Sequence, residues 1–244
     1  MVHPLEQWFL WFAIYSFIGW VYESILCSVA GKKLVNRGFL NGPVCPIYGT
    51  GAVAVVYILS PLKDEPVLLF FASAILTTAL EYLTSFGMEK LFHARWWDYS
   101  KRFLNIRGRV CLRGFLAFGA MSVLVVRYAH PRVAALTSRL SARATHILAA
   151  ALALLFAADL TLTLITVLGL DKRLQAAREA LREQIEERLG ERFPQLRGLH
   201  AFQMKRLSLA FPALDFTRYH EEWQKMRERL RHKPLRMDRR EDGK

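Results

Sequence analysis

The chain has 244 residues, of which 53% are hydrophobic and 23% are charged, and its net charge is +13. The charge is unevenly placed, because 19 of the 34 lysines and arginines and 13 of the 21 acids follow Leu170. An apolar front part and a charged back part exclude an ordinary soluble domain, and they disfavour a disordered chain or a disulfide scaffold. The composition predicts a transmembrane domain over residues 1–170 and a basic tail over residues 171–244.

Five segments of the front part are candidates for membrane spans, because about 20 mostly apolar residues cross roughly 30 Å of hydrocarbon. They are residues 5–29, 46–62, 66–88, 112–128 and 146–170. The second and fourth segments are short, which leaves four or six spans as alternatives. We predict an all-α bundle of about five transmembrane helices. The first segment exceeds the roughly 7–15 apolar residues of a signal peptide, and we interpret it as a retained anchor.

The basic residues predict how the bundle is oriented. If the N-terminus lies outside and the C-terminus in the cytoplasm, 29 lysines and arginines fall in cytoplasmic segments and 5 fall outside. Four of these five are arginines of the fourth connection, and we expect its segment Pro131–Arg143 to lie along the outer headgroups. The prediction is a multi-pass protein of the cell membrane.

The tail has the pattern of a soluble helical segment. After Asp171, apolar residues recur at spacings of three and four as far as Gly190, and a second helical stretch covers about residues 219–230. We expect this cytoplasmic tail to stay at the membrane surface, because its arginines are attracted to anionic lipid. A dimerising coiled coil is the alternative. No nucleic-acid-binding signature is present, so membrane lipids and not nucleic acid are the expected partners.

Acidic residues inside the predicted spans need an explanation, because a carboxylate at the bilayer centre costs roughly 2.5–3.5 kcal/mol on insertion scales. Glu23 and Glu81 fall in the cytoplasmic halves of two spans that run inward, and Glu89 follows at the interface. The third connection brings arginines to the same side, namely Arg95, Arg107 and Arg109. The charges either lock helices and loop together or form a charged pocket open to the cytoplasm. Asp159 is separate, and for it we favour an interhelical hydrogen-bonding role over a proton or ion site.

The segment from Asn36 to Gly51 leads into the second span with four glycines between residues 38 and 51 and two prolines. Irregular backbone at membrane depth is tolerated only where protein or a water-filled cavity surrounds it. The segment is either a tight turn packed on neighbouring helices or an unwound entry whose N–H groups face an anion. Its candidate binding residues are Asn36, Arg37, Asn41 and Tyr48. The glycine spacing matches neither the P-loop nor the dinucleotide fingerprint.

The aromatic segment from Phe92 to Ser100 suits a membrane–water boundary. Trp97 and Asp98 lie within it beside Arg95, so that the segment is held by a salt bridge or presents a headgroup or ligand site. The three cysteines have no metal-type spacing, and no nucleophile–base pair is evident. We therefore predict no metal site and no cofactor, and we assign no catalytic residue.

These strings together resemble one known family. They are Gly19-Trp20 with Glu23, NRGFLNGPVCPIYG at 36–49, LEYLTS at 80–85 with Glu89, HARWWDYS at 93–100 and NIRGRVCL at 105–112. The chain resembles the putative ABC-transporter type IV, or CmpB-like, membrane proteins over about residues 5–165, including Asp159. The resemblance implies a bacterial multi-pass membrane protein of the permease type. The chain has no Walker A motif, so an ATPase would be a separate subunit.

Three functions are compatible with the sequence. The first is a transport-associated membrane protein with a charged pocket at the cytoplasmic side, for which a homodimer or a partner would complete the pathway. The second is a membrane-embedded enzyme that acts on a lipid headgroup at the inner face, where arginines would pair with phosphate. The third is an accessory scaffold of another membrane complex. We favour the first, and the sequence identifies no substrate.

Overall fold

The computed structural model describes residues 4–32, 35–168, 206–207, 209–211 and 215–216 of the chain. Its helices are α1 (Pro4–Gly31), α2 (Pro46–Leu59) with the short η1 (Ser60–Leu62), α3 (Pro66–Phe92), α4 (Leu112–Leu124), the π-helical η2 (Val125–Ala129), α5 (His130–Thr137) and α6 (Ala142–Leu168). Two short strands, β1 (Ala94–Arg95) and β2 (Asp215–Phe216), pair in antiparallel orientation. The predicted all-α membrane bundle is confirmed.

Within the described residues, four helical stretches are long and apolar enough to cross a membrane. They are Leu5–Val29, Pro66–Phe92, Leu112–Thr137 and Ala142–Val167, and the apolar helix Pro46–Leu62 is shorter. The surface of these helices is apolar as well: on α6, Leu154 is 72% exposed and Leu155 is 66% exposed. Such residues are unfavourable in water and favourable against lipid tails, as expected of a membrane protein.

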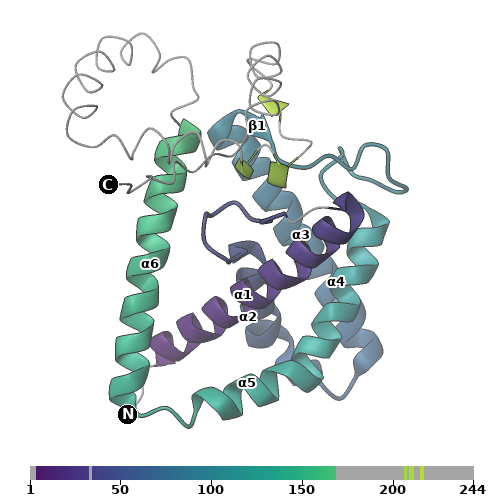
Figure 1. The fold of residues 1–244 in the computed structure, drawn as a ribbon. Helices are drawn as coiled ribbons and strands as arrows, with labels where there is room; N and C mark the ends of the chain where they lie inside the picture. Colours follow the sequence, from purple (N-terminus) through teal and green to yellow (C-terminus); the bar gives the residue numbers. More distant parts are fainter. Residues whose placement is uncertain (1–3, 33–34, 169–205, 208, 212–214, 217–244) are drawn as a thin grey trace, which may run out of the picture.

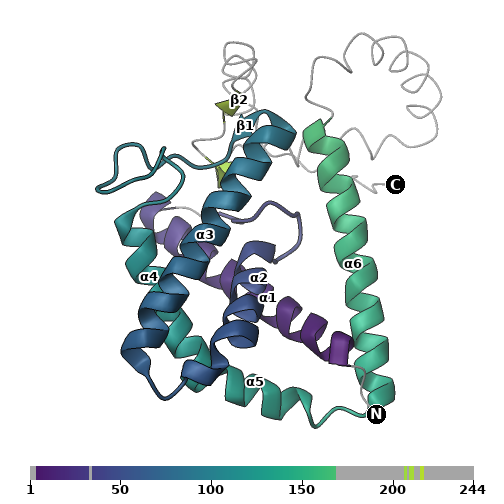
Figure 2. The same cartoon turned by 180° about the vertical axis from the view of Figure 1, so that it is seen from behind.

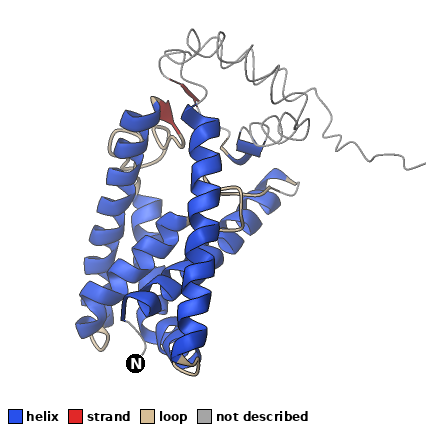
Figure 3. Ribbon diagram, turned by 90° about the vertical axis from the view of Figure 1, so that its left-hand side faces the viewer, coloured by secondary structure: helices blue, strands red, loops and turns tan. Residues whose placement is uncertain are grey.

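The helices are arranged around an oblique α1. In Figures 1 and 2, α3 and α6 stand upright and end at the same end of the bundle, where β1 lies, while α1 crosses between them. We call this the β1 end. Figure 3 shows the two upright helices from the side, with the N-terminal end of α1 at the opposite end. We call that the α5 end, because α5 lies across it in Figure 1.

The turn from α4 into α5 has an identifiable cause. The π-helical η2 replaces the usual i→i+4 hydrogen bonds with i→i+5 bonds, and Pro131, which has no N–H to donate, follows it within the same continuous helical stretch, so the helix bends there. Contacts to α1 then fix the direction of α5. Trp11 Nε1 donates to Thr137 Oγ1 at 3.0 Å, and the Tyr15 hydroxyl lies 3.2 Å from His130 Nδ1. The segment that we expected along the headgroups therefore begins as a helix across the α5 end.

The irregular segment between α1 and α2, residues 35–45, lies beside α6 and is held there by Asp159. The backbone N–H of Asn41 and that of Gly42 donate to the Asp159 carboxylate at 2.9 and 2.8 Å, and Asn41 Nδ2 donates at 2.8 Å. Asp159 lies nine residues before the end of α6, or about 14 Å along the axis at about 1.5 Å per residue. An unwound segment at this depth needs protein partners for its backbone, and Asp159 supplies them.

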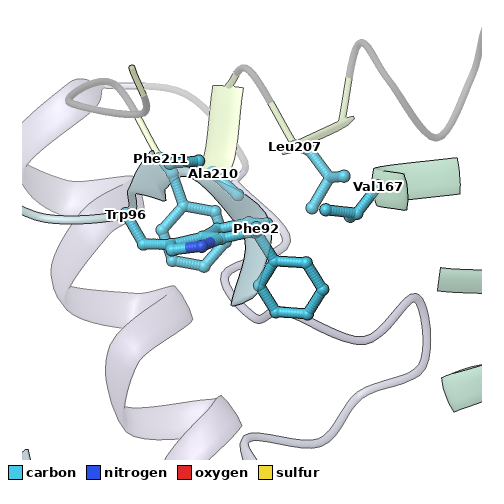
Figure 4. Packing of buried hydrophobic residues seen from close by; sticks show 7 residues of the cluster. Phe92, Trp96, Val167, Leu207, Ala210 and Phe211 are labelled. Carbon is cyan, nitrogen blue, oxygen red and sulfur yellow. The ribbon is translucent and has the colours of Figure 1, made fainter. Parts of the chain in front are cut away.

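Tail residues pack on the β1 end. Figure 4 shows Leu207, Ala210 and Phe211 against residues of α3, α6 and the connection after α3. That cluster contains Phe92, Ala94, Trp96 and Val167. The predicted tail helices over about residues 171–190 and 219–230 lie outside the described residues. Part of the tail is therefore bound to the bundle, which the sequence did not predict.

Removing the Asp159 carboxylate should destabilise the bundle. Asp159→Ala leaves two backbone N–H groups of the segment without acceptors at membrane depth, at a cost of about 1–3 kcal/mol for each donor. Thermal unfolding in mild detergent should show a lower midpoint for Asp159→Ala and a smaller loss for Asp159→Asn, which keeps one carbonyl oxygen. Thr161→Ala is the matched control, because its exposed hydroxyl bonds only to Ala157 O of its own helix. An unchanged midpoint for Asp159→Ala would contradict this role.

Candidate functional site

Glu23 of α1 is held by two side chains from the segment that follows it. The Tyr48 hydroxyl donates to Oε1 at 2.5 Å, and Arg37 Nε lies 3.4 Å from Oε2. Tyr48 approaches α1 closely because Gly19 has no side chain, and a Cβ there would collide with the tyrosine. Glu23 is therefore a paired carboxylate, and its guanidinium comes from the first connection and not from the third.

Asn36, through its side-chain amide, and Arg37, through its backbone N–H, also bind the segment to α1. Trp20 Nε1 donates to Asn36 Oδ1 at 2.6 Å, and the Arg37 backbone N–H donates to Ser24 Oγ at 3.2 Å. Asn36 Nδ2 in turn donates to the carbonyl of Asn41 at 3.1 Å. The candidate binding residues of this segment are thus hydrogen-bonded to one another and to α1. Asp159 of α6 accepts a hydrogen bond from the Asn41 side chain.

Glu89, near the end of α3, is the acid that meets the arginines of the basic connection. Arg109 Nη1 lies 2.6 Å from Glu89 Oε2, and Arg95 Nε lies 3.7 Å from the same oxygen. Arg95 also lies 3.7 Å from Asp98, and Trp97 Nε1 donates to the Arg109 carbonyl at 3.0 Å. These contacts fasten the connection to the β1 end of the bundle.

Arg107 is not part of the Glu89 cluster. It lies exposed in the connection, with a backbone φ of +51°, and is followed by Gly108 at +70°. The neighbouring turn exposes Phe103, Leu104 and Ile106 to 76%, 63% and 58%. The connection therefore divides into a part bound to Glu89 and an exposed turn.

Glu81 differs from the other acids. Its side chain is inside the bundle, with 5% of the residue exposed, and within the described residues Oε2 has no hydrogen-bond partner. The Tyr99 side chain of the connection reaches its carboxyl group. Gly114 of α4 faces the same carboxyl, because a Cβ there would lie 3.5 Å from Oε2. We expected arginines near Glu81, and the connection presents a tyrosine instead.

A cavity of about 190 Å³ adjoins this carboxyl group. Its wall comes from α1, α2, α3, α4 and η2, and it is mostly apolar, with Val55, Leu80 and Met121 among its lining residues. Glu81 is the acid among its lining residues, and Tyr48, which also lines it, donates its hydroxyl to Glu23. We call this space the Glu81 cavity.

Groups outside the spans have protonation states that limit the chemistry. Burial raises the pKa of the Tyr99 hydroxyl, and the Glu81 carboxylate raises it further, so Tyr99 is a protonated donor at neutral pH. Hydrogen bonds from Ser100 lower the pKa of Asp98, which is therefore charged. Among the described residues, no three His, Cys, Asp or Glu side chains are grouped to hold a metal ion.

Two residues that matter here were not predicted as site residues. Tyr99 is next to Asp98 in the aromatic segment that we assign to the membrane–water boundary. Arg206 belongs to the tail, is 8% exposed, and donates to the carbonyls of Gly38 and Phe39 at 3.0 Å each. No periodicity in the sequence indicates that a tail arginine satisfies carbonyls of the first connection.

The fold and these contacts define a class: a helical membrane protein with an unwound segment between α1 and α2 and with one buried and several half-buried carboxyl groups in its bundle. Residues 10–164 match the model of the family described as putative ABC-transporter type IV, and the chain belongs to that family. The comparisons with curated proteins and with solved structures gave no match.

The Glu89–Arg109 pair should contribute measurably to stability. Its side chains are 22% and 11% exposed, so a double-mutant cycle with Glu89→Gln and Arg109→Gln should give a coupling free energy of about 1.5–3 kcal/mol. The matched control is the cycle for Arg95 and Asp98, which are 31% and 40% exposed and should couple by about 0–1 kcal/mol. Unfolding by denaturant in mixed micelles measures both. Equal coupling in the two cycles would contradict the structural role of Glu89.

Proposed function

We propose that this protein is the membrane component of a transport system and that the Glu81 cavity takes part in the transport. Family membership supports a transporter-related role, and the structural observation that carries the proposal is the buried Glu81 carboxyl on the wall of a cavity. Polar groups inside a membrane bundle commonly belong to substrate or ion pathways, because their burial costs free energy that an ordinary bundle avoids.

The two alternatives fit the contacts less well. An enzyme acting on a lipid headgroup needs guanidinium groups free to pair with phosphate. Arg37, Arg95 and Arg109 are instead engaged by carboxylates of the bundle, and Arg107 lies in the exposed turn outside the Glu89 cluster. A scaffold would be expected to pair all of its buried acids, and within the described residues Glu81 forms no salt bridge.

A separate ATPase subunit would supply the energy, because the sequence contains no Walker A motif. Five helices are few for a complete pathway, so we propose that a second copy of the chain or another membrane subunit completes it. The excess of basic residues at the β1 end supports a cytoplasmic location for that end and for the tail, with the N-terminus outside. The membrane would be the cell membrane of a bacterium.

The orientation can be tested by labelling engineered cysteines in intact cells. Asp64→Cys places a thiol in the exposed turn between η1 and α3, and Leu104→Cys places one in the exposed turn at the β1 end. A membrane-impermeant maleimide should label position 64 and not position 104, and both should react after lysis. Labelling of position 104 in intact cells would contradict the proposed orientation.

The transport proposal is tested by purifying the full-length chain from its native membranes in a mild detergent. We expect an ATP-hydrolysing subunit to co-purify. Glu81→Ala should lower the rate of ATP hydrolysis severalfold, because the conformational cycle of the ATPase would be coupled to the cavity. Asp64→Asn is the matched control, since Asp64 is exposed in a turn at the α5 end, and it should leave the rate unchanged. The absence of co-eluting ATP hydrolysis, or equal rates for the two variants, would contradict the proposal.

A further inference from the structure

We infer that the Glu81 cavity binds a small organic ammonium ion with an apolar body. The inference deepens the proposed function by naming the class of solute, and it rests on that proposal for its biological role. The binding itself is a separate property, which four observations support: the charge at the cavity, its aromatic wall, its volume and its opening.

The charge favours a cation. Glu81 is 5% exposed, it lines the cavity, and within the described residues Oε2 has no hydrogen-bond partner. The other nearby carboxylates are partnered, Glu23 by Arg37 and Glu89 by Arg109. A carboxylate in apolar surroundings is stabilised by a counter-ion, and a bound ammonium group would supply that counter-ion in the cavity. An anionic ligand would find no basic side chain among the lining residues.

The wall suits an organic cation better than a metal ion. Tyr15, Tyr22, Tyr48 and Phe118 are lining residues whose rings can attract an ammonium group through their faces. The rest of the wall is mostly aliphatic and would cover an apolar body. A hard metal ion needs about six oxygen ligands, and the described wall contributes one carboxylate and a few hydroxyl groups. The combination of one acid, several rings and aliphatic side chains is typical of sites for ammonium compounds.

Volume and access limit the ligand to a small molecule that reaches the site from the membrane. The cavity holds about 190 Å³, whereas a cavity of about 150 Å³ accommodates benzene. A benzene ring with a short ammonium substituent is therefore of suitable size. Ile18 and Tyr22 of the wall are 49% and 37% exposed on α1, so the cavity adjoins the apolar outer surface of the bundle.

Two glycines provide a matched test of the cavity itself. Gly51 lines the cavity, and a Cβ at this position meets no atom within 4 Å. Gly87 of α3 also has open space for a Cβ, and it does not line the cavity. Gly51→Leu should extend a side chain into the cavity from a position where a Cβ is tolerated, while Gly87→Leu introduces the same side chain on a helix elsewhere.

The experiment measures binding of radiolabelled benzyltrimethylammonium to the full chain in nanodiscs of zwitterionic lipid. We expect saturable binding that neopentylbenzene, the neutral molecule of the same shape, does not displace. Glu81→Gln and Gly51→Leu should each weaken binding at least tenfold, or about 1.4 kcal/mol, and Gly87→Leu should leave it unchanged.

Equal binding by the parent and Glu81→Gln, or equal displacement by neopentylbenzene, would overturn the inference and indicate a cavity for apolar molecules. If Glu81→Gln fails to fold, the two glycine variants decide, and equal binding by both would also overturn it. If the parent protein does not bind benzyltrimethylammonium but Glu81→Ala still lowers the rate of ATP hydrolysis, the ammonium ligand alone is refuted. Binding without any co-purifying ATPase would refute the transport role alone.

Discussion

The contact between Asp159 and the backbone of Asn41 and Gly42 is the interaction on which the rest of the structure depends. Residues 35–45 are not helical, and the N–H groups of such a segment find no water inside a membrane. One carboxylate accepts both N–H groups and the Asn41 side chain. Asp159 needs hydrogen-bond donors inside the bundle, and the unwound segment needs an acceptor for its N–H groups. The hydrogen bonds between them therefore lower the free-energy cost of placing both groups there.

The position of this segment determines what lies around it. Because the chain turns at Asp159, α2 begins inside the bundle and is a short helix, and Tyr48 in its first turn reaches Glu23. Arg37 lies beside the same carboxylate. Arg206 of the tail donates hydrogen bonds to two backbone carbonyls of the segment, those of Gly38 and Phe39. Glu81 is left facing a cavity, while Glu89 holds the connection after α3. Glu23 is thus paired with Arg37, Glu81 lines the cavity, and Glu89 is paired with Arg109.

The sequence predicted the bundle well, because long apolar segments and misplaced acids are local signals. It also favoured a hydrogen-bonding role for Asp159, and it left residues 36–51 as either a tight turn or an unwound entry. Residues 36–45 are irregular, and α2 begins at Pro46. It could not predict which guanidinium meets which acid, since helix direction alone places Glu23, Glu81 and Glu89 at one end without their partners. Arg37 and Tyr99 are the partners found, and they depend on how the two connections fold. The docking of Leu207 and Phe211 had no periodic signal, because a few apolar residues in a basic tail indicate no binding surface.

Amide hydrogen exchange at residues 36–45 in lipid nanodiscs tests the central claim most directly. If Asp159 satisfies this backbone inside the membrane, the amides of Asn41 and Gly42 should exchange as slowly as those of the flanking helices. They should exchange much faster in Asp159→Ala. Exchange of the parent protein at the rate of an open surface loop, unaffected by the substitution, would contradict the account.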